Sequence, residues 1–191
     1  MQPRLAATDL SCRRGGRLLF GGVSFDLGPG EALHVAGPNG VGKSSLLRQL
    51  AGLLRAFTGS VERDGRLGLA SDTLALDRDM PLGSALRFWE TLDASDDPQR
   101  IHDTLGLTKL LDVPVRYLST GQRKRAALAR LAGSGSAIWL LDEPLNGLDA
   151  DARSIVTRMF GDHCAAGGIC VFASHQPLGV DAASLDLERY S

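Results

Sequence analysis

Residues 37–44 read Gly-Pro-Asn-Gly-Val-Gly-Lys-Ser and match the pattern GxxxxGK[ST]. A short apolar run, Ala32–Ala36, precedes them, and Leu46, Leu47 and Leu50 follow at the spacing of one helix face. Glycines in such a loop let successive backbone N–H groups surround one anion, and the dipole of the next helix faces the same anion. The stretch therefore predicts a strand–loop–helix unit that cradles the phosphates of a nucleotide.

Within this loop, two side chains have separate tasks. Lys43 is expected to reach the β- and γ-phosphates, and the Ser44 hydroxyl can ligate Mg²⁺. The chain has only three lysines, Lys43, Lys109 and Lys124, so a lysine at such a position is informative. The predicted nucleotide-binding residues here are Gly37, Pro38, Asn39, Gly40, Val41, Gly42, Lys43, Ser44 and Ser45.

A second motif supplies acidic side chains. The apolar run Ile138–Leu141 ends at Asp142 and Glu143. Because sites in parallel α/β sheets form at the carboxyl ends of the strands, both acids are expected beside the phosphates. Asp142 would hold Mg²⁺, directly or through water, and Glu143 would polarise an attacking water as a catalytic base.

A third motif, Leu118-Ser119-Thr120-Gly121-Gln122, opens a basic helix that is expected to run to about Ala132. Ser119 is a good N-cap residue on any interpretation. A helix start is also an anion site. A second such site is more than one mononucleotide requires, unless two chains enclose the nucleotide between them.

The elements along the chain predict a parallel α/β core with a helical insertion at about 71–135. Helices are expected at 43–51, 82–92, 98–111, 119–132 and 149–165, and strands at 4–11, 23–27, 32–36, 58–65, 137–141 and 168–173. The length of 191 residues suits one domain with a small satellite subdomain.

Composition excludes several classes of protein. The 21 basic and 22 acidic side chains leave a net charge of -1, so the protein as a whole does not attract nucleic acid or anionic lipid electrostatically. The three cysteines form no CxxC pair, which argues against a disulfide framework and a structural zinc site. No apolar run could span a bilayer and no secretory leader is visible, so we expect a cytoplasmic protein whose membrane part is another chain.

Taken together, these motifs resemble the ATP-binding subunits of ABC transporters over essentially the whole chain. Leu140–Pro144, Gly147–Asp149 and Ser174-His175 also have the order and spacing of that family. The resemblance implies an α/β P-loop NTPase fold, with an ABC-type ATPase core, a helical subdomain and a small antiparallel β subdomain. It implies a single ATP-binding domain over residues 1–191 that hydrolyses ATP with Mg²⁺.

The resemblance also implies a head-to-tail dimer with nucleotide sandwiched between two copies. Ser119, Gly121 and Gln122 of one copy would close on the γ-phosphate bound by Lys43 of the other. Asp149 would line the interface, and His175 would contact the γ-phosphate and hold the transition state.

The stretches Cys12–Phe20, Leu50–Leu53 and Leu86–Trp89 narrow the resemblance to the ATP-binding subunits of bacterial cytochrome c maturation, the haem exporter family. This implies a peripheral protein on the cytoplasmic face of the inner membrane, coupled to integral membrane permease subunits. In that family the work supports release of a haem-loaded periplasmic chaperone. No CxxCH motif is present, so nothing in the composition itself indicates haem.

Two positions depart from the family pattern. Asp72 stands where a glutamine is usual, and its shorter carboxylate could still hold a Mg²⁺-bound water. Arg14 replaces the aromatic residue that usually stacks on adenine, and a guanidinium can also stack on a base.

Alternative functions remain open at this stage. The nearest is the ATPase of another small-substrate or lipoprotein ABC exporter. A soluble ABC ATPase of DNA repair would need a long coiled-coil insertion between Gly37 and Ser119, and one of translation normally carries two cassettes in one chain. A small-molecule kinase would lack Leu118–Gln122. No nucleic-acid partner is expected.

Overall fold

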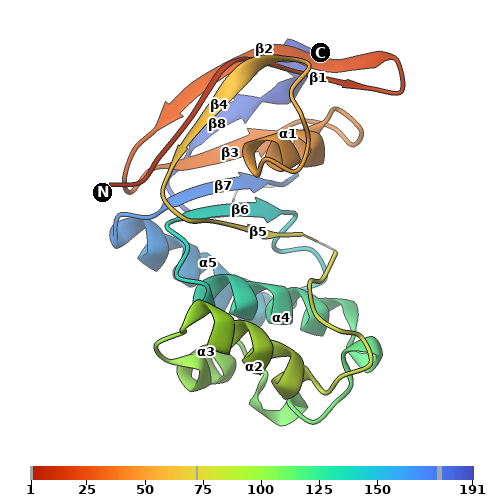
Figure 1. Cartoon of the computed structure of the whole chain (residues 1–191), viewed down its shortest axis with the longest axis vertical. Helices are drawn as coiled ribbons and strands as arrows, with labels where there is room; N and C mark the ends of the chain where they lie inside the picture. The colour runs from red at the N-terminus through yellow and green to blue at the C-terminus, as the bar shows by residue number, and fades with distance from the viewer. Residues whose placement is uncertain (1, 72, 176–177) are drawn as a thin grey trace.

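The computed structural model describes residues 2–71, 73–175 and 178–191. At one end of the molecule, three antiparallel strands form a small sheet in the order β2-β1-β4 (Figure 1). They are β1 (Arg4–Arg14), β2 (Arg17–Leu27) and β4 (Thr58–Asp64). The β1–β2 hairpin turns at Gly15 and Gly16, which both have the positive φ that glycine adopts without strain.

Five parallel strands form the central sheet in the order β5-β6-β7-β3-β8. They are β3 (Ala32–Ala36), β5 (Leu67–Ala70), β6 (Ile138–Asp142), β7 (Ile169–Ala173) and β8 (Ala183–Asp186). The crossovers between them return every strand in the same direction, so the loops that follow β3, β6 and β7 meet at one edge of the sheet.

The two faces of the central sheet bury different cores. On β6, Ile138 and Leu140 pack with helix α1 (Lys43–Leu50) and the antiparallel sheet. Trp139 and Leu141 point the other way, toward α5 (Ala150–Ala165) and the helical block. The strand alternates residue by residue between two apolar environments, which is why its sequence is apolar throughout.

The helical block lies at the end of the molecule opposite the antiparallel sheet (Figure 1). It consists of α2 (Leu82–Asp93), α3 (Pro98–Thr104) and α4 (Thr120–Gly133), with 3₁₀ turns at Thr108–Leu110 and Val115–Tyr117. Among the described residues, no helix is both long and apolar enough to cross a membrane.

Most of the predicted elements are confirmed, with three wrong extents and two omissions. The strands expected at 4–11 and 23–27 run on to Arg14 and start at Arg17, because they pair as one long hairpin. The helix expected at 98–111 ends at Thr104, because Gly106 has a φ of 61° and the chain continues as a 3₁₀ turn. Strands β5 and β8 were not predicted. Each has only 4 residues, too few to show a periodic pattern, and each exists because it pairs with a neighbouring strand.

Candidate functional site

The phosphate-loop candidate joins the end of β3 to the start of α1. Three of its glycines have positive φ: 133° at Gly37, 82° at Gly40 and 118° at Gly42. Gly42 is the N-cap of α1, and an added Cβ there would lie 2.9 Å from the Phe20 ring. Glycine is therefore required at this position both by the backbone angle and by the space, which leaves the first N–H groups of α1 facing the loop.

The ammonium group of Lys43 folds back over the loop. It donates to the carbonyl oxygen of Gly37 at 2.8 Å and to that of Pro38 at 3.2 Å. The side chain is buried, with 7% of its surface exposed. These carbonyls satisfy the buried charge in the structure as it stands, and phosphate oxygens would be stronger partners for it.

Asp142 and Glu143 stand where β6 leaves the sheet. Asp142 is the last residue of β6 and lies opposite Ala173 of β7. Glu143 has a φ of 46°, a conformation that costs a non-glycine residue on the order of 1–2 kcal/mol. Such strain persists only where the surroundings impose it, and it concentrates at functional sites.

His175, which follows β7, reaches both motifs. Its Nε2 atom lies 2.7 Å from Oδ1 of Asn39 and 3.4 Å from Oε1 of Glu143. The imidazole thus joins the phosphate-loop candidate to the predicted base, although 136 positions separate it from Asn39 along the chain.

A cleft of about 230 Å³ brings the phosphate-loop candidate and the two acids together, and His175 contacts two of its lining residues. Its lining residues are Leu19, Asn39, Gly40, Gly42, Lys43, Ser44, Ser45, Asp142 and Glu143. All but Leu19 were predicted from the motifs or neighbour them. Leu19 lies on β2, and it lines the cleft only because the β1–β2 hairpin packs over the loop.

The donor set in this cleft suits a magnesium ion. Ser44 and Asp142 offer a hydroxyl and a carboxylate, the oxygen ligands that Mg²⁺ prefers. Among the described residues no three His, Cys, Asp or Glu side chains are grouped so that they alone could hold a metal ion. A cation here would take most of its ligands from phosphate and water, as magnesium sites with nucleotides usually do.

The Ser119 motif forms the start of α4 and lies outside this cleft. Ser119 and Gln122 make a capping box: Ser119 Oγ accepts from the Gln122 N–H at 3.2 Å, and Gln122 Oε1 accepts from the Ser119 N–H at 2.8 Å. Ser119 and Thr120 are exposed. Gly121 packs so closely on the loop between β6 and α5 that an added Cβ would lie 2.5 Å from the Gly147 carbonyl oxygen.

Three other predicted residues have different placements. Asp149 is the N-cap of α5 and accepts from the Ala152 N–H at 2.8 Å. Arg14 is exposed at the end of β1 and does not line the cleft, so its contact with a base stays a prediction. Asp72 lies outside the described residues.

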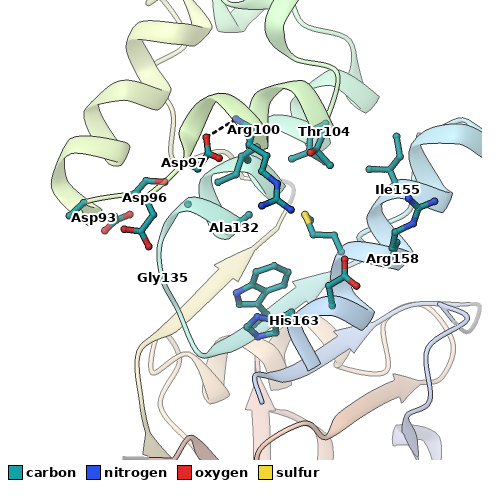
Figure 2. A pocket seen from close by; sticks show the side chains of 18 residues that line it. Asp93, Asp96, Asp97, Arg100, Thr104, Ala132, Gly135, Ile155, Arg158 and His163 are labelled. Atoms are coloured by element: carbon teal, nitrogen blue, oxygen red, sulfur yellow. Dashed lines mark hydrogen bonds between the residues drawn. The ribbon is translucent and has the colours of Figure 1, made fainter. Parts of the chain in front are cut away.

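A larger cavity of about 510 Å³ lies elsewhere, between α3, α4 and α5 (Figure 2). Its floor includes Trp139, on which the His163 ring is stacked with centroids 3.9 Å apart. Burial lowers the pKa of His163. Arg100 and Arg158 line this cavity together with four aspartates, so both signs of charge face it, and none of the nucleotide motifs contributes to it.

Comparison with known proteins shows the family of this chain. The family described as ABC transporter matches residues 20–146. The chain is 57% identical, over 177 residues, to a cytochrome c biogenesis ATP-binding export protein CcmA from Novosphingobium aromaticivorans, covering 93% of this chain and 91% of that protein. It is 50% identical to the protein of the same name from Zymomonas mobilis, covering 98% of this chain and 86% of that one.

Solved structures have the same fold. A putative metal-chelate type ABC transporter in an inward-facing conformation matches with a TM-score of 0.80 at 27% identity, over 98% of this chain and 81% of that one. A putative ABC transporter ATP-binding protein from Pyrococcus furiosus matches with a TM-score of 0.83 at 22% identity, over 98% of this chain and 99% of that one.

Proposed function

This chain belongs to the ABC transporter family as an ATP-hydrolysing subunit, and from that premise we propose that its hydrolysis of MgATP drives an export step in cytochrome c biogenesis. In this proposal it works as a head-to-tail dimer on the cytoplasmic face of the inner membrane, attached to integral membrane permease subunits. The step it supports is release of a haem-loaded chaperone.

The observation that carries the catalytic part is the convergence of three chain segments, two of which line one cleft while the third contacts residues of that cleft. Lys43 comes from the loop after β3, Glu143 from the end of β6 and His175 from the end of β7. These segments bring together a lysine, an imidazole and the carboxylate of a residue with a strained backbone, all at the edge of one parallel sheet. Such a set suits transfer of a phosphoryl group to water.

Each group has a distinct task in that reaction. The Glu143 carboxylate accepts a proton from water as the water oxygen attacks the γ-phosphorus, and the bond to the β–γ bridging oxygen breaks to give ADP and phosphate. Lys43 neutralises charge on the β- and γ-phosphates. Mg²⁺ held by Ser44 and Asp142 would supply further charge neutralisation. His175, whose Nε2 faces Asn39 Oδ1 in the structure, would turn this donor to the γ-phosphate oxygens when nucleotide is bound.

The position of α4 supports the proposed dimer. Ser119 and Gln122 cap their own helix, yet neither lines its own cleft, and Ser119 is exposed. A helix start with small residues is an anion site. We infer that it completes the cleft of a second copy by meeting the γ-phosphate there.

The membrane partner is proposed to dock on the helical block. On α2, Phe88 and Leu92 lie one turn apart, with 61% and 65% of their surfaces exposed. Together with Ser84, Arg87 and Thr91 they border a hollow of about 430 Å³. An exposed apolar pair at this spacing fits the apolar face of a short helix from a permease.

Glu143→Gln tests the catalytic part. The amide cannot accept the proton, so turnover should fall on the order of 10²-fold or more, while MgATP affinity is retained and an ATP-bound dimer accumulates. Glu62→Gln, at an exposed residue of β4, is the matched control and should hydrolyse ATP normally. Hydrolysis by Glu143→Gln close to that of wild type would reject this assignment.

The biological part needs a cell. In a bacterium that lacks its own subunit, the wild-type chain should restore c-type cytochromes with covalently attached haem, and Glu143→Gln should not. Normal haem attachment without any functional subunit would favour the alternative, an exporter of another small substrate or of lipoproteins.

For the docking surface, the double change Phe88→Asp and Leu92→Asp should prevent co-fractionation with membranes that contain the permease while leaving ATP binding intact. Leu18→Asp is a control at an exposed apolar residue of β2, at the opposite end of the molecule (Figure 1). Retention of the double variant on these membranes would place the partner elsewhere.

A further inference from the structure

Lys124 lies inside the molecule, on α4, with only 5% of its surface exposed. It is one of three lysines in the chain, and it belongs neither to the phosphate loop nor to the Ser119–Gln122 cap. Its ammonium group donates to the backbone carbonyl oxygen of Asp142 at 3.1 Å. Burying an ammonium group costs free energy because the group loses its hydration. The position of this group beside the end of β6 therefore needs an explanation.

The bond from Lys124 acts on one particular peptide unit. The Asp142 carbonyl and the Glu143 N–H are the two polar ends of the same planar group. The N–H end donates to the Ala173 carbonyl oxygen of β7 at 2.9 Å. The peptide plane between Asp142, the candidate metal ligand, and Glu143, the candidate base, is therefore held at one end by α4 and at the other by β7.

Holding this plane fixes the direction of the catalytic side chain. The orientation of the plane sets ψ of Asp142 and φ of Glu143, and φ of Glu143 is the strained 46°. A left-handed conformation at a glutamate relaxes unless its neighbours maintain it. A hydrogen bond from a charged donor is about twice as strong as one between neutral groups, which suits Lys124 to that task.

We propose that Lys124 is a positioning residue that holds Glu143 in its reactive direction and links it to the helix start that meets the second copy. Lys124 stands two residues after Gln122 on the same rigid helix. Movement of α4 when Ser119 engages the partner's nucleotide therefore acts on the chain's own base. This inference rests on the proposed function, because it needs Glu143 as the base.

Lys124→Met tests it, because methionine keeps the apolar stem and loses the donor. Loss of a charge-assisted bond predicts a decrease in kcat of roughly tenfold to a hundredfold, with ATP affinity unchanged within about twofold. Lys124→Arg keeps a cationic donor and should recover most of the loss. Lys109→Met, the same change at an exposed lysine of the helical block, is the control and should behave as wild type.

A double-variant cycle separates positioning from general support of the fold. If Lys124 acts through Glu143, adding Lys124→Met to Glu143→Gln should lower the residual turnover by less than about twofold. A further tenfold loss in the double variant, or equal losses of ATP binding and turnover in the single variant, would overturn the proposal. If Lys124→Met does not fold, the same measurements are made on Lys124→Gln.

The two failures are distinguishable. Full turnover of Glu143→Gln would reject the base itself and with it the proposed catalytic function. Loss of turnover in Glu143→Gln together with wild-type kcat in Lys124→Met would reject only the role of Lys124.

Discussion

Replacing Ser119 by alanine distinguishes a helix cap from a shared catalytic site. In the structure this change removes one bond of the capping box, from the Gln122 N–H to Ser119 Oγ at 3.2 Å. Loss of an N-cap costs about 1 kcal/mol of folding free energy, and in a chain of this length that lowers Tm by roughly 2–4 °C. If Ser119 were only a cap, the alanine variant would keep the wild-type turnover per folded molecule.

A shared site predicts a different result for the same variant. Because Ser119 lies outside its own cleft, the alanine chain should bind ATP normally and yet hydrolyse it at least tenfold more slowly, as expected for a lost hydrogen bond of about 1.5 kcal/mol to a charged oxygen. The assay compares steady-state turnover per folded chain with the melting temperature of the same preparation.

Mixing two defective chains gives the decisive measurement. A dimer of one Lys43→Ala chain and one Ser119→Arg chain has one site with both defects and one site with neither. Each homodimer has a defect in both sites, so mixing should restore activity that neither variant has alone, up to about half per mixed dimer if the sites fire independently.

The control is Ser119→Arg alone, which must bind ATP normally and hydrolyse it poorly, because strict alternation between sites could suppress recovery in the mixture. Full activity of Ser119→Arg as a monomer would refute the shared-site reasoning and leave the motif as a cap.

Three further predictions concern the loop, a close backbone contact and pH. Lys43→Ala loses a charge-assisted contact of roughly 1.5–3 kcal/mol and should bind ATP at least tenfold more weakly in equilibrium titration; unchanged affinity would show that the loop is not the cradle. Gly121→Ala puts a Cβ 2.5 Å from the Gly147 carbonyl oxygen and should destabilise the chain by about 1–3 kcal/mol in urea unfolding, whereas Gly161→Ala, in open space on α5, should be neutral or stabilising. Burial lowers the pKa of His163 below its usual 6.5, so the unfolded chain takes up this proton first and stability is lost as the pH falls below that value; His163→Phe should weaken this loss, and an equal loss in both chains would contradict it.

The local motifs and the fold class could be predicted because they depend on short-range patterns. The phosphate loop needs glycines at fixed offsets and a helix behind it, and the capping box needs only Ser119 and Gln122. The apolar run before Asp142 indicated a strand buried on both faces. Each of these features is determined within fewer than about ten consecutive residues, which a single sequence displays directly.

Long-range contacts could not be read in this way. The sequence indicated neither β5 nor β8, because each is stabilised by a partner strand from a distant part of the chain. Leu19 entered the cleft only when the β1–β2 hairpin packed over the loop, and no pattern around Leu19 predicts that.

For this protein, the sequence by itself determined the chemical groups and the local shapes that present them: the loop, the acids at the end of β6 and the capped start of α4. Only the tertiary structure decided which of these groups meet. It brought His175 within 3.4 Å of Glu143, directed Lys124 to the Asp142 carbonyl and left Ser119 away from its own cleft. The physical reason is that the motifs are stabilised by neighbouring residues, whereas their convergence is a property of how the sheet and the helical block pack.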